Sequence, residues 1–173
     1  MSKDYWLFEK ETGDIGFLAG VVDVLSDNLG MLLDYAYALD ADVFFVKDND
    51  MSLLNDSVKK RLHYYNIRYG LHISEKEIDA LDFELIKSDA DPEKVLCDFI
   101  SNYSSKKDVL QGVKEFFTDL NWYLQKPLCI YNPVRLPDHN IDVLGSVYLY
   151  MAWDYFFIAY YDYLVLFVLG TVE

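Results

Sequence analysis

The chain has 173 residues, a net charge of −14, a hydrophobic fraction of 53% and an aromatic fraction of 17%. This composition excludes an intrinsically disordered chain, and the length suits one domain that buries about 70% of its unfolded surface. The negative charge argues against nonspecific binding to nucleic acid or an anionic membrane surface, because both need positive charge. It favours a basic partner, although acidity also keeps an aromatic-rich protein soluble.

The first residues carry charges from Lys3 onward and contain no apolar signal core, so we expect no secretory signal and a cytoplasmic protein. Two isolated cysteines, Cys97 and Cys129, are expected to be buried thiols in a reducing compartment.

The first long predicted element is an amphipathic helix over residues 14–39. Seven apolar residues recur at helical spacing on its inner face: Leu18, Val22, Leu25, Leu29, Leu32, Ala36 and Leu39. Asp23, Asp27 and Asp34 fall on the opposite side, which predicts an outward row of carboxylates. Three glycines near that side weaken the helix by up to about 1 kcal/mol each: Gly16, Gly20 and Gly30.

The row belongs to an acidic block over residues 11–56, which holds ten acidic residues against one basic residue. Four further aspartates of this block follow the predicted helix: Asp40, Asp42, Asp48 and Asp50. The first pair is expected to end the helix, and the second pair forms a turn cluster after a short predicted strand at residues 43–46. The cluster is not a calcium loop, because the central Gly and closing Glu of that pattern are missing.

The middle of the chain predicts mainly helices. They cover residues 52–65, a short segment from 74 to 82 or 85, a segment beginning at Asp91-Pro92, and residues 106–124. Residues 64–73 read as strand or loop, and a brief strand is expected at residues 128–131.

The run from Val143 to Val172 contains no Lys, Arg, Glu or Pro and is rich in aromatic residues. A membrane span needs about 20 apolar residues, so the run is long enough. However, Asp154 and Asp162 lie inside it, and its flanks lack the Lys/Arg cluster that orients a span. We therefore expect two or three antiparallel core strands, roughly over residues 146–153, 154–160 and 163–172.

No catalytic motif is present, whether for a nucleophile, a zinc ligand set, a phosphate loop or a dinucleotide. The sequence predicts a protein that is not an enzyme and has no cofactor and no metal site. An enzyme of another kind would need His63 or His72 to converge with carboxylates in a pocket.

The 15 tyrosines exceed what an ordinary core requires, because a buried hydroxyl needs a hydrogen-bond partner. Tyr161 and Tyr163, near the predicted hairpin tip, are expected to reach the surface, where tyrosine often anchors a protein partner. Together with the seven aspartates named above, they form the predicted partner-binding set.

The closing segment, Asp154-Tyr-Phe-Phe-Ile-Ala-Tyr-Tyr-Asp-Tyr-Leu-Val-Leu-Phe-Val-Leu-Gly-Thr-Val-Glu173, and the small acidic build resemble the immunity proteins of bacterial polymorphic toxin systems. These include the systems of contact-dependent growth inhibition. The resemblance covers about twenty residues and implies a protein that binds one cognate toxin domain, often a basic nuclease, and blocks its active site or substrate groove.

The predicted fold is α+β: a single domain over residues 1–173, with N-terminal helices packed on a C-terminal antiparallel sheet or hairpin. The predicted function is a cytoplasmic, non-enzymatic antitoxin that neutralises a basic toxin domain by protein–protein interaction. The alternatives are a DNA-mimic inhibitor of host nucleases and a small membrane-associated protein that uses residues 143–169.

Overall fold

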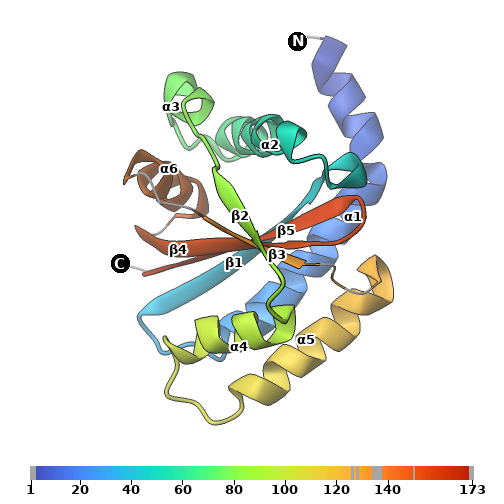
Figure 1. Cartoon of the computed structure of the whole chain (residues 1–173). Helices are drawn as coiled ribbons and strands as arrows, with labels where there is room; N and C mark the ends of the chain where they lie inside the picture. The colour runs from blue at the N-terminus through green and yellow to red at the C-terminus, as the bar shows by residue number, and fades with distance from the viewer. Residues whose placement is uncertain (1–2, 126, 128, 134–137, 150, 172–173) are drawn as a thin grey trace.

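A computed structural model describes residues 3–125, 127, 129–133, 138–149 and 151–171. A five-stranded antiparallel sheet lies between two layers of helices, which confirms the predicted α+β class (Figure 1). The helices are α1 (Lys3–Gly30), α2 (Leu54–Tyr69), α3 (Glu75–Asp79), α4 (Pro92–Ser101), α5 (Val109–Leu124) and α6 (Asp138–Tyr148). The strands are β1 (Tyr37–Phe45), β2 (Leu85–Ser88), β3 (Cys129–Pro133), β4 (Met151–Ala159) and β5 (Tyr163–Thr171).

The strand order is β1-β5-β4-β3-β2, so β5 lies inside the sheet between β1 and β4. Its residues from Leu164 to Leu169 are each exposed by 1% or less. Alternate side chains of a strand point to opposite faces, and here Val165, Phe167 and Leu169 join one apolar cluster while Leu164, Leu166 and Val168 join the other.

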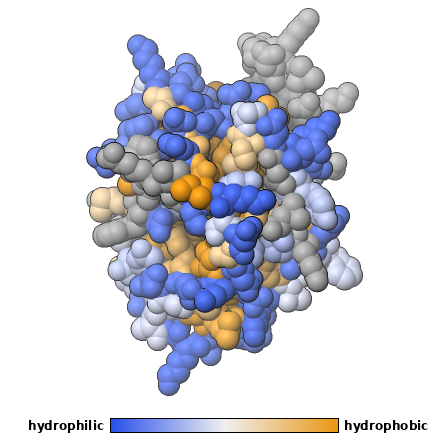
Figure 2. Space-filling model, viewed as in Figure 1, coloured by the Kyte–Doolittle hydropathy of each residue, from blue (hydrophilic) through white to orange (hydrophobic). Residues whose placement is uncertain are grey.

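The two helical layers cover the two faces of the sheet. The first cluster contains buried residues of α1, α4 and α5, and the second contains buried residues of α2, α3 and α6. Figure 1 shows this division, with α4 and α5 on one side of the strands and α2, α3 and α6 on the other. In the same view, Figure 2 shows a largely hydrophilic surface with apolar side chains near its centre.

The aromatic run forms core strands, as predicted, and no helix in the described ranges is long and apolar enough to cross a membrane. Strands β4 and β5 match the predicted segments 154–160 and 163–172, of which Val172 lies outside the described residues. The predicted separate strand over residues 146–153 is wrong, although residues 151–153 do begin β4. Its first three residues end α6, whose buried Val143, Leu144 and Val147 pack on the sheet.

The predicted helix over residues 14–39 begins earlier and ends at Gly30. Residues 37–39 instead start β1, where Leu39 pairs with Leu169 of β5. The predicted strand over residues 43–46 is therefore only the end of a longer strand. At residues 37–39 the apolar residues are spaced as in a helix, but pairing with the central strand β5 decides the structure.

The remaining helices of the middle segment are confirmed. Asp91 caps α4 by accepting a hydrogen bond from the Glu93 N–H at 3.2 Å, as the Asp-Pro pair predicts. The predicted brief strand over residues 128–131 appears as β3, with Leu128 outside the described residues. Both cysteines are free thiols; Cys129 is buried, but Cys97 is only half-buried.

Helices α1 and α5 approach closely at one end. A Cβ added to Gly112 of α5 would lie 2.4 Å from Leu32 Cδ1, just beyond the end of α1. In contrast, Gly16 and Gly20 of α1 have no atom within 4 Å of an added Cβ. The two helices therefore pack tightly near Leu32 and leave an open space near Gly20.

This difference predicts unequal effects of one substitution at two glycines. Gly20→Ala is expected to raise the free energy of unfolding by about 0.5–1 kcal/mol, because alanine favours a helix and meets no neighbour. Gly112→Ala is expected to raise it less, because the terminal methyl group of Leu32 must first move away from the added Cβ. Urea denaturation of both variants measures the two values, and equal effects would contradict this packing.

Asp154 lies on β4 at a register irregularity and is half-buried. Burial raises the pKa of its carboxyl group, although the carboxylate accepts a hydrogen bond from the Tyr155 N–H at 2.8 Å. Above this raised pKa the buried carboxylate is charged, and the free energy of unfolding is lower. As the pH falls through the raised pKa, the folded protein takes up a proton at Asp154 and this destabilisation disappears.

Asp154→Asn is consequently expected to raise the melting temperature at pH 7, because asparagine keeps the acceptor oxygen without the charge. Near pH 3.5, below the ordinary pKa of aspartate, we expect little difference from the parent. Thermal unfolding followed by circular dichroism checks both values. The exposed Asp142→Asn is the control and should change little at either pH.

Candidate functional site

The structure brings part of the predicted acidic set together at the β1 edge of the sheet. Asp23 of α1 and Asp40 and Asp42 of β1 line a cavity of about 230 Å³. Tyr65 and Tyr69 of α2 form another wall, and the end of α6 closes the space. None of the described residues that line this acidic cleft is Lys or Arg.

The carboxylates of the acidic cleft interact unfavourably. Partial burial is the largest cause that raises the pKa of Asp23, followed by the negative charges of Asp27 and Asp42. Asp27 lies about one turn further along α1 and is exposed, as is Asp23. Because Asp27 and Asp42 disfavour the charged form of Asp23, this part of the surface has a negative potential that a cationic group would relieve.

Asp42, one of the predicted partner-binding residues, is buried and lies in no exposed contact surface. Its exposed fraction is 4%, and its Oδ1 lies 3.1 Å from Arg61 Nη2. The Tyr65 hydroxyl donates a second hydrogen bond to Asp42 Oδ2 at 2.7 Å. Burial and the Asp42 charge both raise the pKa of that hydroxyl, so it stays protonated and donates. Strand β1 faces α2 at this position, and the carboxylate therefore pairs internally.

Replacing Asp42 should therefore destabilise the fold. Asp42→Ala leaves the Arg61 charge buried without its partner, which costs about 3–5 kcal/mol in comparable sites. The double variant Asp42→Ala/Arg61→Leu is expected to recover part of this loss, because no charge is then left unpaired. Urea denaturation measures both, and a loss below about 1 kcal/mol in the single variant would show that the pair is not needed.

Asp34 does not lie in the outward row of carboxylates that the sequence predicts on the first helix. It lies beyond the end of α1, and its carboxylate accepts hydrogen bonds from the Ser105 N–H at 3.0 Å and the Ser105 hydroxyl at 2.8 Å. These bonds lower the pKa of Asp34. Its backbone N–H also bonds Tyr103 O, so Asp34 holds the α4–α5 connection against the end of α1.

The other predicted residues gather at the far end of β1, beside the β4–β5 turn. The Asp48 N–H donates to Asp162 Oδ1 at 2.8 Å. The Asp50 carboxylate accepts from the N–H and hydroxyl of Ser52, which lowers the pKa of Asp50. Tyr161 is 58% exposed, whereas the ring of Tyr163 packs edge-on against Phe45 at 5.6 Å. Tyr161 thus reaches the surface, and Tyr163 is largely a packing residue.

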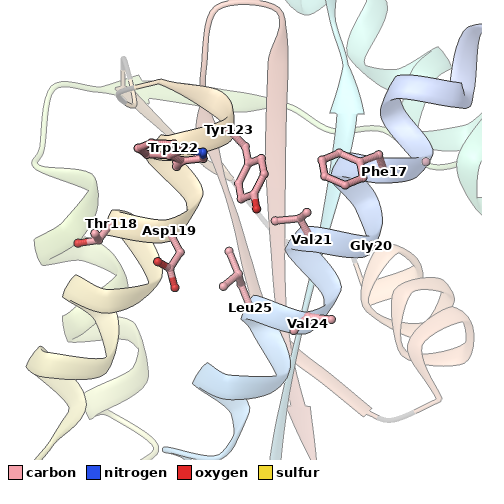
Figure 3. Close-up of a pocket in the computed structure, with 10 residues that line it drawn as sticks. Phe17, Gly20, Val21, Val24, Leu25, Thr118, Asp119, Trp122 and Tyr123 are labelled. Atoms are coloured by element: carbon pink, nitrogen blue, oxygen red, sulfur yellow. The ribbon is translucent and has the colours of Figure 1, made fainter.

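A groove between α1 and α5 was not predicted from the sequence. It has a volume of about 660 Å³ and a mainly apolar lining. Figure 3 shows Phe17, Val21 and Leu25 of α1 directed toward α5, with Tyr123 facing Phe17 across the gap. The rings of Phe17 and Tyr123 are 5.8 Å apart and meet edge to face. We call this space the α1–α5 groove.

Apolar residues outside the predicted inner stripe of the first helix do indicate the α1–α5 groove. Phe17 and Val24 are large apolar residues that fall outside the predicted inner stripe of the first helix. Trp122, near the end of α5, is 86% exposed, although it lies in a helix whose other large apolar residues are mostly buried. Apolar residues away from the stripe mark a second apolar face, but their partner helix could not be predicted.

The histidines do not converge on either cavity. His63 Nε2 lies 2.8 Å from Asp79 Oδ1 at the surface of α2 and α3, and His72 is exposed. Across the described part of the chain, no group of three or more His, Cys, Asp or Glu residues could hold a metal ion. Comparison with protein-family models, curated proteins and solved structures found no match.

Proposed function

We propose that the protein is a cytoplasmic, non-enzymatic immunity protein that binds a basic toxin domain and neutralises it. The observation that carries the proposal is the negative potential at α1 and β1, where partial burial and the charges of Asp27 and Asp42 raise the pKa of Asp23. A cationic protein surface would relieve this repulsion. The resemblance of the closing aromatic segment to immunity proteins of polymorphic toxin systems supports the same function.

The proposed mechanism is occlusion rather than chemistry. A nuclease domain holds its anionic substrate in a basic groove, and an acidic protein can occupy that groove in place of the substrate. Asp23 and Asp27 are exposed on α1 and available for such contacts. Asp42 makes no such contact, because its carboxylate is buried and paired with Arg61.

The test begins with the reading frames beside the gene for this chain, where we expect to find the basic toxin domain. Co-expression is expected to restore growth, and purified proteins should bind with an association rate that falls steeply with salt. Asp23→Lys/Asp27→Lys is expected to slow association about tenfold or more at low salt. Its melting temperature should not fall, since both side chains are exposed and Asp23 is electrostatically disfavoured.

The matched control is Glu84→Lys/Asp89→Lys, which changes the net charge equally on exposed residues beside β2, at the opposite edge of the sheet. An equal loss in both double variants would show that only net charge matters. Failure of the parent protein to bind or protect against this toxin would refute the proposal. Protection against several unrelated nucleases would instead identify a DNA mimic.

A further inference from the structure

The α1–α5 groove exposes more apolar surface than the fold itself needs. Trp122, Phe17 and Val24 are exposed by 86%, 61% and 60%. An exposed, contiguous apolar surface of this kind typically marks a binding site, and tryptophan is among the residues most often found at binding hot spots. The groove lies on the outer side of two helices whose inner faces already fill the core.

The ends of the groove limit the size of what it can hold. The Phe17–Tyr123 ring contact lies at one end of the lining, and the close approach of Gly112 to Leu32 lies beyond the other end. On α1 the lining runs from Gly16 to Leu25, which corresponds to about 14 Å of helix axis. Two to three turns of a second helix would match this length, with side chains at i, i+3, i+4 and i+7 directed inward.

The charges beside the groove select a basic occupant. Asp119 of α5 lies in its lining, and Asp27 lies seven residues after Gly20, on nearly the same side of α1. Between Gly16 and Gly30, α1 contains two aspartates and no Lys or Arg. A second copy of this chain is disfavoured as the occupant, because each copy has a net charge of −14.

We propose that the α1–α5 groove binds an amphipathic helix of the partner, with an apolar stripe against Trp122 and Phe17 and with Lys or Arg beside Asp27 and Asp119. This inference rests on the proposed function for the identity of the partner. It adds the form of the recognised segment and the residues that anchor it. Trp122 is the anchor, and the open side of Gly20 is the space that the bound helix fills.

The first experiment uses a fluorescent 18-residue peptide of Leu, Ala and Lys with one apolar helical face, and a scrambled peptide of identical composition. Fluorescence anisotropy at 150 mM salt measures binding of each to the full chain. We expect the amphipathic peptide to bind about tenfold or more tightly than the scrambled one, because only it presents a stripe to the groove. Equal binding would overturn the inference, since charge alone would then explain the interaction.

Two variants test the location. Trp122→Ala removes the anchor, and Gly20→Gln fills the open space without a clash at Cβ. Each is expected to weaken amphipathic-peptide binding about tenfold or more. The first control is Gly20→Ala, which changes the helix propensity and leaves most of the open space unfilled. The second is Ile67→Ala, which removes a 65% exposed apolar side chain on α2. The controls should stay within about twofold of the parent, which is typical outside hot spots.

Two further outcomes would overturn the inference. One is unchanged binding in both groove variants. The other is a dimer in sedimentation velocity that Trp122→Ala converts to monomer, because the groove would then hold a second copy of the chain. Circular dichroism confirms that each variant remains folded.

The toxin domain separates this inference from the proposed function. If the parent neutralises the toxin and both groove variants do so equally well, the groove is not the contact but the immunity function stands. If the parent binds the amphipathic peptide through the groove but does not bind the toxin domain, the proposed function fails and the groove retains its helix-binding role.

Discussion

The burial of β5 on both faces is the constraint on which the rest of the structure depends. From Leu164 to Leu169 the strand has almost no exposed surface, so helices must cover the sheet on each side. Its neighbours β1 and β4 satisfy its backbone hydrogen bonds along nearly the whole strand. A strand of this kind can be placed only at the centre of a three-layer fold.

This arrangement forces charge to the periphery. Both clusters that contact β5 are apolar, and the acidic block of the first third of the chain is distributed over α1, the edge strand β1 and the turns beyond it. The buried exception, Asp42, lies on that edge strand and is paired with Arg61 and Tyr65. Partial burial and the charges of Asp27 and Asp42 together raise the pKa of the neighbouring Asp23.

The sequence was a good guide wherever local pattern and tertiary packing agree. The Asp91-Pro92 start of α4 and the aromatic strands are examples, because capping and continuous apolar runs have few alternative structures. The sequence-based predictions are wrong where the structure of a segment depends on contacts with residues far away in the chain. Residues 37–39 keep helical spacing but pair with β5, and Ser146 to Tyr148 have strand-forming neighbours but complete α6. The burial of Asp42 follows from the same unpredicted length of β1.

Helix α1 connects the two surfaces that could act in recognition. Asp23 lines the acidic cleft beside β1, while Gly20, Val21 and Val24 line the apolar groove beside α5. A partner bound along this helix would therefore meet negative charge and apolar surface together. The two properties act on different stages of binding: charge accelerates the encounter, whereas desolvated aromatic contacts mainly slow dissociation. Because one helix presents both surfaces, a partner whose basic and apolar faces have matching spacing would contact them together.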